Sequence, residues 1–137
     1  MNNSPAEISD SDFLSQFENK SLDHLHFDHL GHLRIAWLYL NAQDLDSAIR
    51  STCTGIKTYA ESLGAKDKFS YTITNALVRI MATRIRDLND RSWQGFIRQN
   101  NDLVNDAMSV LLLHFSEALL FSEVARTSII APDLKEY

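Results

Sequence analysis

Four of the five histidines in the chain lie in one stretch, DHLHFDHLGHLRIAWLYL, which runs from Asp23 to Leu40. An imidazole can ligate a metal, transfer a proton, or donate and accept hydrogen bonds near neutral pH. This stretch is therefore where the sequence most strongly indicates a functional site.

The four histidines are not equivalent on a helical projection. At about 100° per residue, His32 falls about 60° from His29, so the two rings can point at one spot. The pair lies in the middle of the apolar face, and the small Ala36 leaves room beside it, whereas Gly31 and Arg34 fall on the opposite, solvent-facing side. We expect the other two histidines, His24 and His26, to precede the helix in an exposed connector.

Three interpretations of His29 and His32 stay open, because a buried imidazole needs partners for both of its nitrogens. The pair could ligate a divalent metal, which accepts two imidazoles three residues apart on a helix. It could line a small-molecule pocket and act there as an acid–base group. It could also belong to a structural hydrogen-bond network between helices.

A second predicted helix, over 67–88, carries hydroxyl groups on its apolar face. Ser70 and Thr74 fall inside the arc of apolar residues, while Asn75, Arg79 and Arg86 fall outside it. Buried hydroxyls can bond back to a carbonyl one turn earlier. They could equally line a polar pocket opposite the histidine pair.

The remaining elements that must position these residues are also predicted to be helical. Ser9, Asp28 and Asp44 are placed as N-caps, and a short helix is expected to start at Ser92. The apolar residues that follow these caps recur at helical spacing. Further helices are expected over 103–114, with Asp102 as its cap, and over 116–130. We expect a flexible N-terminal tail at 1–8 and one all-α domain over 9–137, a bundle of five or six helices.

Composition excludes several classes of protein. The net charge of −5 disfavours binding to nucleic acid or to an anionic membrane, although five arginines between Arg79 and Arg98 leave a local positive patch open. No apolar run is long enough to span a bilayer, and the N-terminus does not have the pattern of a signal peptide. With Cys53 as the single cysteine, we expect a soluble cytoplasmic protein.

Several catalytic motifs are missing from the sequence. It contains no G-x-S-x-G, no glycine-rich phosphate loop and no C-x-x-C, which disfavours a triad hydrolase, a nucleotide-binding fold and a zinc ribbon. Cys53 lies in a predicted helix without a histidine beside it, so we expect it to be a core residue.

The motif Phe27-Asp28-His29-x-x-His32-Leu33-Arg34-Ile35-Ala36-Trp37 resembles the opening motif of a family of small, uncharacterised bacterial all-helical proteins. The segment FSYTIT, from Phe69 to Thr74, and the C-terminal pattern that begins at His114 resemble later parts of the same family. The resemblance covers roughly residues 25–135.

The chain departs from this family at two positions. The family pattern implies a histidine where this chain has Ser70 and a glutamate where it has Tyr71, which together with His29 and His32 would be close in type to a metal site. Without them, a metal would need another ligand such as His114 or Glu117. A pocket built from Ser70, Tyr71 and Thr74 would suit a small organic molecule better than an ion.

The sequence thus favours a small-molecule-binding protein, which could be an enzyme with His29 and His32 as its catalytic acid–base groups. The alternatives are a non-catalytic helical interaction protein with structural histidines, and a domain that binds a divalent metal through His29 and His32. A homodimer is a candidate assembly. The expected ligand contacts are Trp37, Ser70, Tyr71, Thr74 and His114.

Overall fold

The computed structural model describes residues 8–137, and this part of the chain contains helices and no strand. The expected tail over 1–8 lies outside the described residues, except for Ile8. The elements in chain order are α1 (Asp10–Glu18), the 3-10 turn η1 (His24–His26), α2 (His29–Ala42), α3 (Leu45–Ser62), the 3-10 turn η2 (Lys66–Lys68), α4 (Tyr71–Arg86), α5 (Trp93–Gln99), α6 (Asn101–Leu111), α7 (Glu117–Leu120) and α8 (Glu123–Thr127).

The prediction of an all-α fold is confirmed, whereas the predicted number of five or six helices is too low. The eight α-helices of the described residues include two short ones, α7 and α8, where a single helix over 116–130 was expected. The chain breaks there because the Ser122 side chain accepts a hydrogen bond from Ala125 N and starts a new helix.

Four helices start where the sequence predicts, whereas α4 starts at Tyr71 and not near Asp67, because residues 66–68 form the turn η2. The side chains of Ser9, Asp28, Asp44 and Ser92 each accept a hydrogen bond from a backbone N–H in the first turn, at 2.8–3.1 Å. These contacts satisfy N–H groups that have no partner inside the helix. The local sequence therefore determines where α1, α2, α3 and α5 begin.

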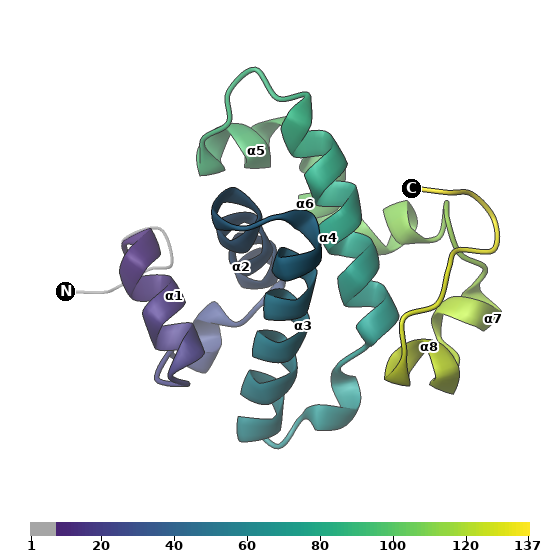
Figure 1. Cartoon of the computed structure of the whole chain (residues 1–137), viewed down its shortest axis with the longest axis horizontal. Coiled ribbons are helices and arrows are strands. Elements are labelled where there is room, and N and C mark those ends of the chain that lie inside the picture. Colours follow the sequence, from purple (N-terminus) through teal and green to yellow (C-terminus); the bar gives the residue numbers. More distant parts are fainter. Residues whose placement is uncertain (1–7) are drawn as a thin grey trace.

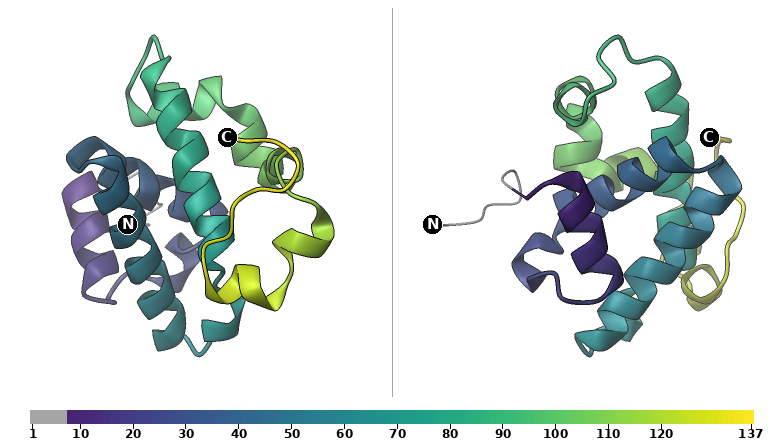
Figure 2. Two further views of the ribbon diagram at one scale, coloured as in Figure 1. Left: turned by 45° about the vertical axis from the view of Figure 1, so that its right-hand side comes forward. Right: turned by 60° about the vertical axis from the view of Figure 1, so that its left-hand side comes forward.

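Helix α3 packs against both α2 and α4, and these three helices form the centre of the fold (Figure 1). Helix α1 covers α2 and α3 on one side, and α8 contacts α4 on the other. The turned views in Figure 2 show the chain after α6 running along the side of α4 that faces away from α1. None of the described helices is both long and apolar enough to cross a membrane.

Two residues of the histidine stretch were expected at the surface but are buried. Arg34 is 7% exposed; its Nη2 donates to Ile8 O at 2.7 Å and to Asp10 Oδ1 at 2.8 Å, and its guanidinium lies over the Phe13 ring. His26 is 9% exposed, and its backbone oxygen lies directly against Gly31 in the first turn of α2. Helix α1 and η1 cover the side of α2 that a helical projection alone assigns to solvent.

Candidate functional site

A cavity of about 140 Å³ lies between α2, α3, η2 and α4, and we call it the central cavity. Eight of the residues that line it are apolar and five are polar, and Lys68 is the exposed member of the set. The lining residues are His32, Leu33, Ala36, Thr52, Ile56, Lys68, Phe69, Ser70, Ile73, Thr74, Leu77, Val78 and Met81.

His32 contributes the imidazole of this lining. Its ring packs edge-on against the Phe27 ring, with the two centroids 4.3 Å apart. Burial, with a smaller contribution from the charge of His29, lowers the pKa of His32 to about 4, although the Asp28 carboxylate acts in the opposite direction. The ring is therefore neutral at pH 7.

Two polar atoms of the lining residues lack hydrogen-bond partners. His32 Nε2 and Thr52 Oγ1 are both inaccessible to solvent, and neither forms a hydrogen bond within the described part of the chain. An unsatisfied buried donor or acceptor costs about 1–3 kcal/mol. His26 Nδ1 and Trp37 Nε1 are also buried without a hydrogen-bond partner among residues 8–137, but these two residues do not line the cavity. What distinguishes His32 Nε2 and Thr52 Oγ1 is that their residues line the same cavity.

His29 lies one turn before His32 but does not line the central cavity. Its Nε2 is 2.8 Å from the carbonyl oxygen of Leu103, so this nitrogen carries the hydrogen and donates it. The bond joins α2 to α6 across 74 residues of sequence. The two histidines thus share a helix face but have different surroundings.

Of the three hydroxyl residues predicted for the pocket, Ser70 and Thr74 line the central cavity and Tyr71 does not. Ser70 is the N-cap of α4, since its Oγ accepts from Ile73 N at 3.2 Å. Thr74 is buried one turn further along α4. The Tyr71 ring lies edge-on against Phe69 instead, 4.8 Å away between centroids.

The other two predicted ligand contacts, Trp37 and His114, do not line the central cavity either. Trp37 packs against Trp93 with their ring centroids 5.6 Å apart. His114 follows α6, where its Nδ1 donates to Lys135 O at 2.9 Å, and its ring is close to Tyr137. His114 therefore holds the C-terminal segment against the body of the fold.

The main lining residue that the sequence prediction missed is Thr52. It recurs with the apolar residues of α3, and such a threonine is ordinarily a core residue that bonds back to its own helix. Its spacing from Ala48 and Ile56 predicts that Thr52 lies on the buried face of α3. The spacing does not predict that Thr52 Oγ1 lacks a hydrogen-bond partner among the described residues. That feature depends on the packing of α2 and α4 around it.

A metal ion would need more ligands than this region offers. Among residues 8–137 there is no group of three or more histidine, cysteine, aspartate or glutamate side chains that could hold a metal. His29 already uses Nε2 for the Leu103 carbonyl. Glu117 and His114, the replacement ligands suggested by the sequence, do not line the cavity with His32.

The fold and the cavity define a small helical protein with an interior pocket lined mainly by apolar side chains. The chain matches no protein-family model, no curated protein and no solved structure. The resemblance to a bacterial helical family therefore stays a prediction.

Proposed function

We propose that this protein binds a small, uncharged and mainly apolar molecule in the central cavity, and that His32 and Thr52 hydrogen-bond to its single polar group. The observation that carries the proposal is the pair of unsatisfied atoms, His32 Nε2 and Thr52 Oγ1, on residues that line one cavity. Ligand pockets typically combine an apolar lining with a few polar groups of this kind.

The size of the cavity limits the ligand. A volume of about 140 Å³ is close to that of an engineered protein cavity of about 150 Å³ that binds benzene. The ligand is therefore a single ring or a short branched chain. Phe69, Ile73 and Met81 supply the apolar contacts on the α4 side.

The charge state of His32 restricts which polar group the ligand can carry. With a pKa lowered to about 4, the imidazole is neutral at pH 7 and offers no positive charge to a carboxylate. A hydroxyl suits the site because it can donate one hydrogen bond and accept another. Such a ligand could satisfy both His32 Nε2 and Thr52 Oγ1 after a small adjustment of the side chains.

The low pKa also bears on catalysis. A general acid works best when its pKa lies near the working pH, and very little of His32 is protonated at pH 7. His29 donates Nε2–H to a backbone carbonyl and does not line the cavity. These facts favour ligand binding by His32 and a structural role for His29 over acid–base catalysis by the pair.

The test uses phenol as the probe and benzene as its apolar counterpart, with binding followed by NMR chemical shifts of the cavity residues. Phenol should bind several-fold more tightly than benzene. Thr52→Val should remove most of that preference, because one net hydrogen bond is worth about 1 kcal/mol, or roughly fivefold in affinity. The matched control is Thr54→Val, at an exposed position on the same helix.

A second variant tests whether the probes bind in the central cavity. Ala36→Ile places a larger side chain in the cavity, and it should abolish binding of both probes while the protein keeps its helical circular dichroism and cooperative unfolding. The proposal is wrong if phenol does not bind the unaltered protein, or if it binds the Ala36→Ile variant as tightly.

A further inference from the structure

Among residues 8–137, three of the six arginines from Arg79 onward form an ion pair with a carboxylate, and Arg79, Arg86 and Arg91 do not. Arg84 pairs with Asp102 at 2.6 Å, and Arg98 pairs with Asp90 at 2.9 Å. Neither Arg79 nor Arg86 forms an ion pair with any residue in the range 8–137. Both of these arginines line the same surface cleft, which we call the arginine cleft.

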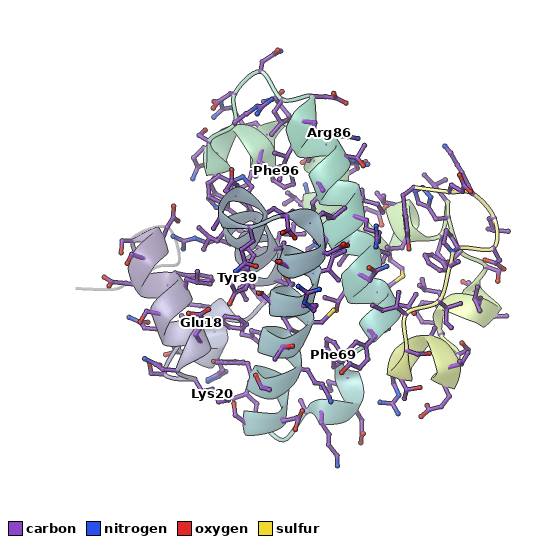
Figure 3. The ribbon with its side chains drawn as sticks, viewed as in Figure 1. Glu18, Lys20, Tyr39, Phe69, Arg86 and Phe96 are labelled. Carbon is purple, nitrogen blue, oxygen red and sulfur yellow. The ribbon has the colours of Figure 1, made fainter. Side chains whose placement is uncertain are left out.

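The arginine cleft lies beside the C-terminal half of α4, where the chain passes from α2 to α3, and its volume is about 430 Å³. Figure 3 places Arg86 near the end of α4 that is opposite to Phe69, a residue of the central cavity. The cleft is thus a separate candidate site. Its volume is within the range of about 300–1,000 Å³ that is usual for ligand sites.

The cleft combines positive charge with apolar surface. Leu40, Leu45 and Ile85 contribute the apolar part, and none of the lining residues that the structure describes is aspartate or glutamate. The whole chain carries 18 acidic and 13 basic residues. In a protein with this acidic excess, two arginines without a carboxylate partner in one cleft are a specific local feature.

The spacing of the two arginines lets them act together. Seven residues correspond to nearly two turns, so Arg79 and Arg86 lie on one face of α4, about 10 Å apart along its axis. Arg79 Nε donates a hydrogen bond to Asn75 Oδ1 at 3.1 Å. This bond holds the Nε side of the guanidinium in place and leaves its two terminal nitrogens for a ligand. Guanidinium groups bind phosphate and carboxylate through paired N–H donors.

An aromatic residue completes the cleft. Tyr137 lines it, and its ring also packs against the His114 and Phe115 rings. Burial raises the pKa of the Tyr137 phenol, and the positive charge of Arg79 acts in the opposite direction, so the two side chains are electrostatically coupled. A ring bound in this cleft would therefore have an aromatic side chain next to the cationic group.

We propose that the arginine cleft binds an organic anion, with its oxyanion group on Arg79 and Arg86 and its apolar body against Leu40, Leu45 and Ile85. The ligand class is an aromatic or aliphatic phosphate or carboxylate. This proposal does not depend on a ligand in the central cavity, which takes an uncharged molecule.

The experiment titrates the full chain with phenyl phosphate at low ionic strength and follows both the affinity and the shifted NMR signals. Arg79→Gln and Arg86→Gln should each weaken binding by about tenfold. Arg98→Gln removes the same charge at an exposed position outside the cleft and should leave the affinity within about twofold. Benzoate in a parallel titration distinguishes a phosphate from a carboxylate site.

Two further titrations separate specific binding from other causes. Inorganic phosphate should bind more weakly than phenyl phosphate, because it makes no contact with the apolar surface. Phenol should shift signals of the central cavity and leave those of the arginine cleft unchanged. The proposal is overturned if phenyl phosphate does not bind, or if Arg98→Gln weakens its binding as much as the two cleft variants do.

Discussion

His29 and His32 show how neighbouring residues of one type acquire different properties. Both lie on the covered side of α2, and the sequence alone gives no reason to separate them. The difference comes from Leu103, whose carbonyl oxygen accepts a hydrogen bond from His29, while His32 Nε2 is left without a partner among residues 8–137. The sequence indicates the pair, but Leu103, which gives the two histidines different hydrogen bonding, lies more than 70 residues further along the chain.

The lowered pKa of His32 predicts a specific dependence of stability on pH. Because the pKa is about 4 in the folded protein and about 6.5 in an unfolded chain, the unfolded state binds more protons between these values. The stability that depends on a neutral His32 is fully present above pH 6.5, and it is lost as the pH falls toward 4. The free energy of unfolding should decrease by about 2–3 kcal/mol over this window.

Denaturant unfolding at several pH values checks this prediction. His32→Asn should remove most of the decrease between pH 6.5 and 4, while His24→Asn should leave it unchanged, since the His24 side chain is 70% exposed. The same pH slope in the unaltered protein and in His32→Asn would contradict the assignment. Carboxylates such as Asp102 and Asp90, whose pKa values are lowered by their hydrogen bonds, add their own losses at lower pH.

The local sequence is most informative about where helices start. The starts at Ser9, Asp28, Asp44 and Ser92 are predictable because each cap bond joins residues three apart in the sequence. The prediction failed at Asp102, which lies inside α6 and binds Arg84 of α4. Competition from a partner 18 residues away cannot be read from the local sequence.

The close approach of η1 to α2 predicts that a glycine-to-alanine substitution, which usually stabilises a helix, destabilises this protein. Replacing glycine by alanine inside a helix ordinarily stabilises it by about 0.5–1 kcal/mol. At Gly31, however, a Cβ atom would lie 2.0 Å from the backbone oxygen of His26. Gly31→Ala should therefore destabilise the protein by more than about 2 kcal/mol, because η1 has to move away from α2.

The measurement is the free energy of unfolding in urea. The control is the reverse substitution on the same helix, Ala42→Gly, at the exposed last position of α2, which should cost at most about 1 kcal/mol. A Gly31→Ala variant as stable as the unaltered protein would show that η1 does not approach α2 this closely.

The long-range contacts of the C-terminal segment have no signal in the local sequence. The sequence predicted helices and a stop at Pro132, but the way this segment returns to α4 depends on contacts more than 50 residues apart. The central cavity has the same origin, since α2, α3 and α4 each supply part of its lining. Periodicity shows which faces are buried, and only the packing shows where they leave space.

Thr72 is the main test of how the C-terminal segment is held. This residue is fully buried on α4, where its Oγ1 donates to Ser128 O at 2.6 Å and accepts from Ile130 N at 3.0 Å. Thr72→Val keeps the shape of the side chain but removes both hydrogen bonds. We expect a loss of about 1–3 kcal/mol, because a partly buried carbonyl and N–H lose their partner.

The loss should be concentrated in the segment from 128 onward, since the remaining hydrogen bonds between residues 129–137 and the described helices before them lie at residues 133–137. Leu134 N and Lys135 N donate to His114 O, Lys135 O accepts from His114 Nδ1, and the Asp133 carboxylate accepts from Ser116. Hydrogen exchange in Thr72→Val should accelerate at Ile130, Leu134 and Lys135, with α2 and α3 little changed. Thr83→Val, at an exposed position on the same helix, serves as the control. If exchange accelerates uniformly over all helices instead, the C-terminal segment and the central helices unfold as one cooperative unit.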